Sequence, residues 1–191
     1  EASEFEKLRD RRIELIKATK DSDPAELIGV YGRAQLFGTH PFGRPVGGSE
    51  ASLAAIEHQD VLDYYTEQFG SDRLTLVVAG DVDVHALKRE VEQAFGGWHA
   101  AAVPLTRPTD SGRVKGRRVL LVDSPDSAQT YFWLANVGVP KRYAQHAALD
   151  LVNTLYGGRF TSILNTELRI KSGLSYSARA NFARGTVAGE F

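Results

Sequence analysis

Apolar side chains in this chain follow two different spacings, and this mixture restricts the fold more than any other feature. A helical spacing, with an apolar residue every three or four positions, occurs at Val84, Leu87, Val91 and Ala94. Just before it, LTLVVAG (74–80) is a short continuous apolar run, typical of a strand buried on both faces. Both spacings recur without a strict strand–helix–strand order. We therefore expect an α+β fold built of layers.

The same reasoning predicts the remaining elements. Asp23 and Pro24 supply a capping carboxylate and a proline at the first helical position, and Gly38 ends the helix that they begin. Another helix, over 4–20, carries an apolar stripe. Further helices are predicted near 61–69, 83–95, 144–156 and 160–168. Strands are predicted at 74–80, 117–123, 128–139, 174–183 and 185–191.

A change of composition divides the chain. Over 99–117 the sequence is rich in Pro, Thr, Ser, Gly, Arg and Lys and has little periodicity, which is typical of a linker. We place the linker at 104–117, with one domain over 1–103 and a second over 118–191. The chain contains no methionine, begins in a helical pattern and ends in a strand-like one. We therefore expect a segment of a longer protein, with both domains incomplete.

Composition excludes several classes of function. Lys and Arg number 23 against 24 Asp and Glu, so neither sign of charge favours nucleic acid or an anionic membrane surface. No apolar stretch approaches the roughly 20 residues that span a bilayer. The chain has no cysteine, which excludes disulfides and thiolate metal sites. This leaves the compartment unknown, with bacterial cytoplasm and periplasm both open.

Familiar catalytic motifs do not occur in these residues. The five histidines, at positions 40, 58, 85, 99 and 146, include no pair at i, i+4, and neither H-E-x-x-H nor H-x-x-E-H is present. No G-x-S-x-G elbow occurs. The glycine-rich loop GTHPFGRPVGGSE (38–50) lacks a Gly-Lys-Ser/Thr step and follows a helix rather than a strand. The histidines are interpreted as scattered surface or loop residues.

Three stretches nevertheless resemble one known family. Residues 40–98, beginning HPFGRPVGGSE, look like the second half of a repeated domain of the insulinase/pitrilysin zinc peptidases, which include the mitochondrial processing peptidase. LLVDSPDSAQTYFWLANVGV (120–139) and LVNTLYGGRFTSILNTELRIKSGLSYSARANF (151–182) resemble the start of the next domain. The resemblance implies two α+β domains of common ancestry. In the family, two such two-domain halves close around a peptide chamber.

The resemblance also bears on the metal. The family holds zinc with an inverted H-x-x-E-H motif and a glutamate on a later helix, and the motif would precede Glu1. Counted back from Asp23-Pro24, the expected glutamate falls near Ile16, which cannot ligate zinc. Glu14 lies two residues away and would point about 200° around the helix. We expect no cofactor in this segment, and zinc in a partner half.

Arg169 and Tyr176 match, in spacing, an arginine and a tyrosine that the family's partner halves retain. The resemblance implies that both side chains bind the peptide substrate near the scissile bond. Taken alone, Arg169 would be a cation at a helix end, and Tyr176 could be a core residue in line with Leu174 and Phe182.

Gly157 and Gly158 have two interpretations. They are either punctuation between two helices or the counterpart of a glycine-rich loop that handles substrate in the family. Because the loop is short here, the structural interpretation is favoured, although both glycines stay candidates for substrate binding.

The resulting hypothesis is a metal-free half of an insulinase-type metallopeptidase, inactive on its own. Its expected partners are a peptide substrate and a zinc-bearing half, in a homodimer or a heterodimer. Two alternatives stay open. The segment could belong to an active zinc endopeptidase whose inverted motif lies upstream, or to a scaffold subunit of the same fold with no proteolysis.

Overall fold

Helices make up most of the regular structure. A computed structural model describes residues 1–22, 24–109, 114–125 and 127–191. Asp23 of the predicted cap and residues 110–113 of the predicted linker lie outside the described residues. The helices are α1 (Ala2–Ser22), α2 (Pro24–Phe37), η1 (Pro41–Gly43), α3 (Glu50–Ala54), α4 (His58–Gln68), η2 (Ser71–Arg73), α5 (Val84–Phe95), α6 (His146–Tyr156), α7 (Ile163–Asn165) and the π-helical η3 (Thr166–Lys171).

Local signals account for most of these helices. The Asp83 carboxylate accepts hydrogen bonds from the backbone N–H groups of His85 and Ala86, at 2.8 and 3.0 Å, and so begins α5. Gly38 follows α2 with φ +56°, a conformation that favours glycine, and confirms the predicted end of that helix. The predicted helices over 4–20, 24–37, 83–95 and 144–156 are confirmed to within two residues at each end.

The predicted strands are mostly wrong. In the described residues the sheet consists of β1 (Ala183–Arg184) and β2 (Gly189–Glu190), which pair antiparallel, with an isolated bridge from Val137 to Glu190. Residues 74–80 and 117–123 pair with no strand, nor does most of 128–139 or 174–183. A strand needs a neighbour for its N–H and C=O groups, and a run of apolar residues does not supply one. The described residues are thus mainly helical with little sheet, whereas the sequence predicted layers of helices on sheets.

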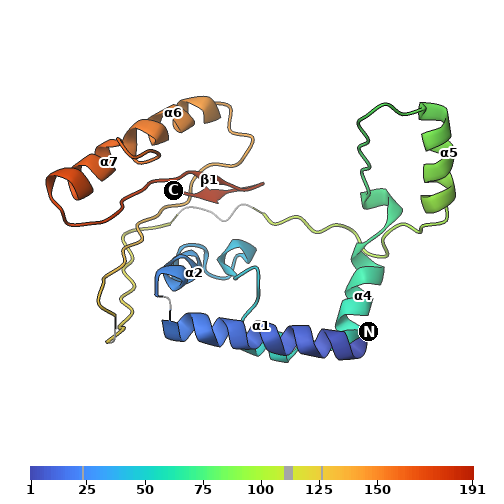
Figure 1. The fold of residues 1–191 in the computed structure, drawn as a ribbon, viewed down its shortest axis with the longest axis horizontal. Coiled ribbons are helices and arrows are strands. Elements are labelled where there is room, and N and C mark those ends of the chain that lie inside the picture. Colours follow the sequence, from blue (N-terminus) through green and yellow to red (C-terminus); the bar gives the residue numbers. More distant parts are fainter. Residues whose placement is uncertain (23, 110–113, 126) are drawn as a thin grey trace. The chain divides into compact units, whose positions relative to one another are not determined.

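The unpaired segments expose their apolar side chains. Val77, Leu121, Phe132 and Leu134 are between 81% and 89% exposed. Figure 1 shows the segment between η2 and α5 as an extended chain with no strand drawn beside it. The apolar stripe predicted on the first helix is likewise uncovered, because α1 contains no buried residue.

The described residues form two compact units, 1–15 with 49–107 and 16–48 with 108–191. In the first unit, the Asp72 carboxylate accepts a 2.7 Å hydrogen bond from Ala101 N–H, and Arg73 bonds the carbonyls of Gln68 and Val103. These contacts tie the end of α4 to the chain that follows α5. The domain limits expected at 103 and 118 stay a prediction.

The second unit is held together by packing on α2 and by two ion pairs. Leu36, Phe37 and Ala188 are its buried apolar residues. Arg33 on α2 donates to both carboxylate oxygens of Glu190 on β2, at 2.9–3.0 Å. These hydrogen bonds raise the pKa of Arg33, partly offset by desolvation, so the guanidinium keeps its charge.

A second ion pair and one aromatic contact complete this unit. Arg184 on β1 donates to Asp150 on α6 at 2.7 and 3.0 Å. The Trp133 ring lies directly against Gly32 of α2, where a Cβ atom would overlap it. The unit therefore places α6, and the residues that follow it, against the small sheet.

Candidate functional site

The chain reverses direction after α6, and this reversal builds the candidate site. Figure 1 shows α6 and α7 in orange, with the chain returning from η3 toward β1. The reversal includes a turn at Gly157 and Gly158, the short helix α7, the π-helical turn η3 and an extended segment from Leu174 onward. Gly173 ends η3 with φ +65°, which confirms the predicted break between Arg169 and Tyr176.

The predicted helix over 160–168 begins later than expected. The Ser162 hydroxyl accepts from Asn165 N–H and caps α7, while Phe160 stays outside the helix and is 60% exposed. The following six residues form a π-helix, closed by a 3.1 Å bond from Ser172 N–H to Glu167 carbonyl. A π turn shifts side-chain directions relative to α-helical counting. The direction of Arg169 was therefore not predictable from spacing.

Arg169 lies between two aromatic rings. Its guanidinium carbon is 4.7 Å from the centroid of Tyr176 and 4.9 Å from the centroid of Phe160. Both distances are within the range of cation–π attraction. No group of the described residues accepts a hydrogen bond from this guanidinium, and the Tyr176 hydroxyl has no described partner either. The rings hold the cation in place and leave its donors available.

Asn165 joins the two sides of the reversal. It is 4% exposed, its Nδ2 donates to the Phe160 carbonyl at 2.7 Å, and its Oδ1 accepts from Ala178 N–H at 3.3 Å. One buried amide thus fixes both the residue before α7 and the extended segment beyond Tyr176. A buried amide with its hydrogen bonds satisfied defines a local conformation. Asn165 therefore positions Phe160 and Tyr176 around Arg169.

Gly157 allows the extended segment to approach closely. Its carbonyl accepts from Ala180 N–H at 3.2 Å, and a Cβ atom at Gly157 would lie 2.5 Å from the Ala180 Cβ. At Gly158 an added Cβ would meet Asn153 of α6 at 3.0 Å. Packing at this turn thus excludes a side chain at Gly157 and leaves little room for one at Gly158. Their contact with substrate stays a prediction.

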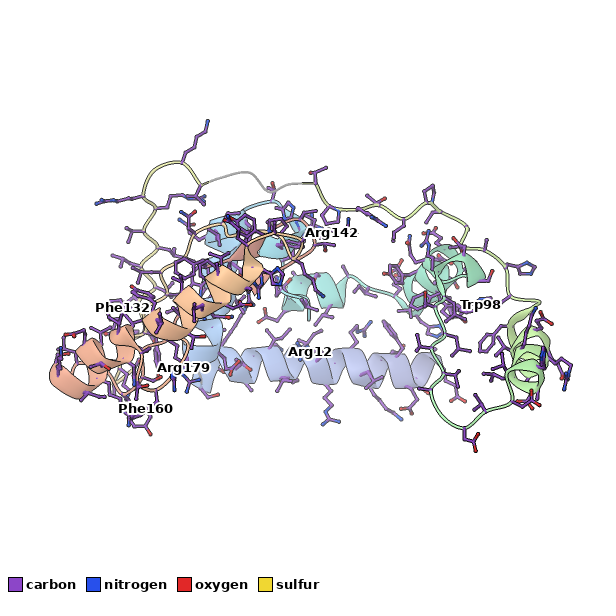
Figure 2. The ribbon with its side chains drawn as sticks, turned by 90° about the horizontal axis from the view of Figure 1, so that it is seen from above. Arg12, Trp98, Phe132, Arg142, Phe160 and Arg179 are labelled. Atoms are coloured by element: carbon purple, nitrogen blue, oxygen red, sulfur yellow. The ribbon has the colours of Figure 1, made fainter. Side chains whose placement is uncertain are left out.

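These elements enclose a shallow pocket of about 300 Å³. Arg159, Phe160, Asn165, Arg169 and Arg179 line it, with three small residues beside them. Figure 2 labels two of these residues, Phe160 and Arg179, which lie near each other beside the orange helices. Among the described residues the pocket has three cationic side chains and no acidic one.

The structure brings together the two residues that the sequence singled out, and it adds two that were missed. Tyr176 is 84% exposed, which contradicts the alternative that it fills a core. Phe160 was wrongly placed inside a helix, and Asn165 was overlooked. The serine three residues before Asn165 is the usual mark of a helix start, and it could have placed Phe160 outside the helix.

The described residues offer no site for the family's metal. They contain no group of three or more His, Cys, Asp or Glu side chains that could hold an ion. Ile16, at the position expected for a ligand, has no donor atom and is half-buried on α1. The residues present thus do not fit a zinc centre. Within the described chain, no helix is long and apolar enough to cross a bilayer.

Comparison with known proteins identifies the family. Residues 55–191 match the sequence profile of the peptidase M16 inactive domain. The chain belongs to the peptidase M16 family. The resemblance to insulinase-type zinc peptidases is thereby confirmed.

Curated M16 relatives are longer than this chain. It is 34% identical over 162 residues to an uncharacterized zinc protease of Mycobacterium leprae, covering 84% of this chain and 36% of the relative. It is 33% identical over 178 residues to an uncharacterized zinc protease of Mycobacterium tuberculosis (strain H37Rv), an alignment that covers 92% of this chain and 40% of the relative. A non-peptidase homolog of Helicobacter pylori is 26% identical, over 86% of this chain and 38% of the relative. The chain thus spans about two fifths of the length of these relatives.

Two solved structures share the fold. One is the peptidase M16 inactive domain from Pseudomonas fluorescens, with a TM-score of 0.78 and 20% identity, which covers all of this chain and 46% of that one. The other is a protease from Helicobacter pylori, with a TM-score of 0.80 and 17% identity, which covers all of this chain and 47% of that one. At these identities the similarity concerns the fold alone.

Proposed function

We propose that this chain is part of the metal-free half of an M16 peptidase, and that it holds a peptide substrate opposite a zinc-bearing half. The observation that carries the proposal is the convergence of Arg169 and Tyr176. Their side chains are in contact across the chain reversal, and their hydrogen-bond donors have no partner among the described residues. The match to the inactive domain supports a binding role rather than a catalytic one.

Each side chain has a chemistry suited to an extended peptide. A guanidinium presents several N–H donors in one plane, which suits a peptide carbonyl or carboxylate. A phenol can donate one hydrogen bond to an oxygen on which negative charge develops. Held by Phe160 and Tyr176, the Arg169 side chain loses little further freedom when it binds, which favours affinity.

The proposal includes the domain organisation. We infer two related domains, over 1–103 and 118–191, joined by a linker at 104–117 and both incomplete in this chain. The exposed apolar segments at 74–80 and 117–123 support this, because extended runs of that composition normally pair inside a sheet. Zinc, in this proposal, is held by the partner half, and the two halves form a homodimer or a heterodimer.

The test is a pair of variants in the full natural protein, assembled with its zinc-bearing half. Tyr176→Phe removes one hydroxyl and should lower kcat by about 10²–10³, the usual effect of losing one oxyanion donor. Arg169→Lys keeps the charge but loses the planar fork, so it should raise KM. Tyr143→Phe is the matched control, because among the described residues its hydroxyl donates to the nearby Gln145 alone, at 2.9 Å.

Melting temperature separates binding from folding in this test. Tyr176 is 84% exposed, so Tyr176→Phe should not change the melting temperature. Unchanged turnover in both site variants would refute the proposal. A fall in turnover equal to that of Tyr143→Phe would refute it as well.

Two other functions have support among the relatives. The Helicobacter pylori relative is a non-peptidase homolog, which favours a scaffold with no proteolysis. The mycobacterial relatives are zinc proteases by name, which favours an active enzyme with its inverted motif upstream. The natural sequence preceding Glu1 distinguishes these cases. An intact H-x-x-E-H there would support the active enzyme, and stable co-purification without peptide hydrolysis would support the scaffold.

A further inference from the structure

We propose that the pocket at the chain reversal binds a carboxylate of the peptide, either an acidic side chain or a free C-terminus. This inference rests on the proposed peptide-binding role and adds the chemical class of the group that is recognised. It is carried by three arginines, Arg159, Arg169 and Arg179, which come from three successive segments of the chain and line one pocket.

The charge of this pocket is not balanced by the described protein. None of the three arginines forms an ion pair with a described residue. Glu167, the acidic residue on the same helix η3 as Arg169, forms an ion pair with Lys171 at 2.6 Å. Other arginines of this unit, Arg33 among them, have a carboxylate partner. Three cations around one concavity attract a negative group.

The geometry favours a carboxylate over a larger anion or a cofactor. The pocket volume of about 300 Å³ lies at the lower limit of small-ligand pockets, which span roughly 300–1,000 Å³. The rings of Phe160 and Tyr176 lie within 5 Å of the Arg169 guanidinium carbon and restrain its position. An arginine held in this way can offer two parallel N–H groups, the arrangement that matches a carboxylate.

Asn165 gives the pocket a fixed wall. Its side-chain hydrogen bonds join the Phe160 carbonyl to Ala178 N–H, and both residues line the pocket. Arg159 and Arg179 are each next in sequence to one of these anchored residues. The backbone that carries the two outer arginines is therefore tied together, so the three cations need little rearrangement when a ligand binds.

The experiment measures the affinity of four labelled peptides for the full natural protein by fluorescence anisotropy, with a chelator present to prevent cleavage. The peptides share one sequence except for Glu or Gln at one internal position, combined with a free or an amidated C-terminus. The readout is the ratio of Kd between the neutral amidated peptide and each acidic one. A preference for internal Glu identifies a side-chain carboxylate, and a preference for the free acid identifies the C-terminus.

Arg159→Gln and Arg179→Gln should each lower this ratio by roughly two- to five-fold, the range of an exposed ion pair. Arg179→Glu should lower it further, because it places a negative charge against the ligand. Added salt should reduce the preference in the wild-type protein. Arg142→Gln is the matched control, because it removes one exposed arginine of the same unit that lies before the start of α6 and outside the pocket.

The outcomes separate this inference from the proposed function. Neutral peptides that bind with an affinity dependent on Tyr176, but without preference for a carboxylate, would overturn the inference and leave the proposed function standing. A preference that Arg159→Gln and Arg179→Gln do not reduce would also overturn it. Failure of all four peptides to bind would overturn both. Since Arg159 and Arg179 are exposed, their variants should keep the wild-type melting temperature.

Discussion

Gly32→Ala in helix α2 should destabilise the protein, although replacing a helical glycine by alanine usually does the opposite. A glycine inside a helix costs about 0.5–1 kcal/mol relative to alanine, because its unfolded backbone is freer. Gly32, however, lies against the indole of Trp133. A Cβ atom built there would be 2.6 Å from two carbon atoms of the ring, against an ordinary contact of about 3.5–4.0 Å.

The magnitude follows from these two opposing terms. Overpacking by one methyl group costs about 1–3 kcal/mol, because the ring or the helix must move to make room. Subtracting the helix-propensity gain leaves a net loss of about 0–2.5 kcal/mol in the free energy of unfolding, with a middle value of about 1 kcal/mol. In a protein of 150–250 residues, a loss of about 1 kcal/mol corresponds to a fall of roughly 2–4 °C in melting temperature.

The assay is urea unfolding followed by far-ultraviolet circular dichroism, with Gly29→Ala as the matched control. Gly29 lies on the same helix, and an added Cβ there meets no atom within 4 Å. That variant should stabilise by about 0.5–1 kcal/mol. In a Trp133→Leu background the penalty of Gly32→Ala should disappear, giving a coupling energy within the usual 0.5–3 kcal/mol.

Equal stabilisation by Gly32→Ala and Gly29→Ala would refute this reasoning. It would mean that the Trp133 ring does not occupy the face of α2 at Gly32. A penalty that persists in the Trp133→Leu background would locate the strain elsewhere on the helix and refute it as well.

Three further changes test the contacts around the sheet and the site. Glu190→Gln weakens the bidentate pair with α2 and should cost about 1 kcal/mol by urea unfolding, since one partner is half exposed; no change would mean that the pair contributes nothing. Asn165→Ala leaves the Ala178 N–H unpaired and should cost about 1–3 kcal/mol, with faster amide exchange at that N–H as the local readout. Gly157→Ala brings a Cβ against Ala180 and should lower the melting temperature through a loss of about 1–3 kcal/mol, whereas an unchanged value would show that this turn has room.

Helices were predictable because their signals are local. The ends of α2 and α5 depend on residues within a few positions, such as Gly38 and Asp83, and both were placed correctly. Strands depend on neighbours that are distant in sequence. LTLVVAG (74–80) has the composition of a buried strand, yet no described segment pairs with it. The prediction of a strand buried on both faces was therefore wrong, because composition does not supply the neighbouring strand that pairing needs.

The candidate site shows the same division on a smaller scale. Arg169 and Tyr176 were found from spacing and resemblance, and the reversal at Gly173 was found from the glycine itself. Phe160 was placed on the wrong side of a helix start. Asn165 was not considered, because an amide carries no chemistry of its own and gains importance only through what it joins.

The sequence by itself determined the positions of the main helices, the family, and the arginine and tyrosine that a peptide site would need. These follow from short-range capping, from periodicity and from the order of motifs along the chain. Only the tertiary structure decided that Arg159, Arg169 and Arg179 line one pocket with Phe160, and that the Tyr176 ring lies against the Arg169 guanidinium. That grouping depends on a π-helical turn and a buried amide that together reverse the chain. The amide acts through its bond to Ala178, thirteen residues further along the chain, and local sequence preferences do not encode such a contact.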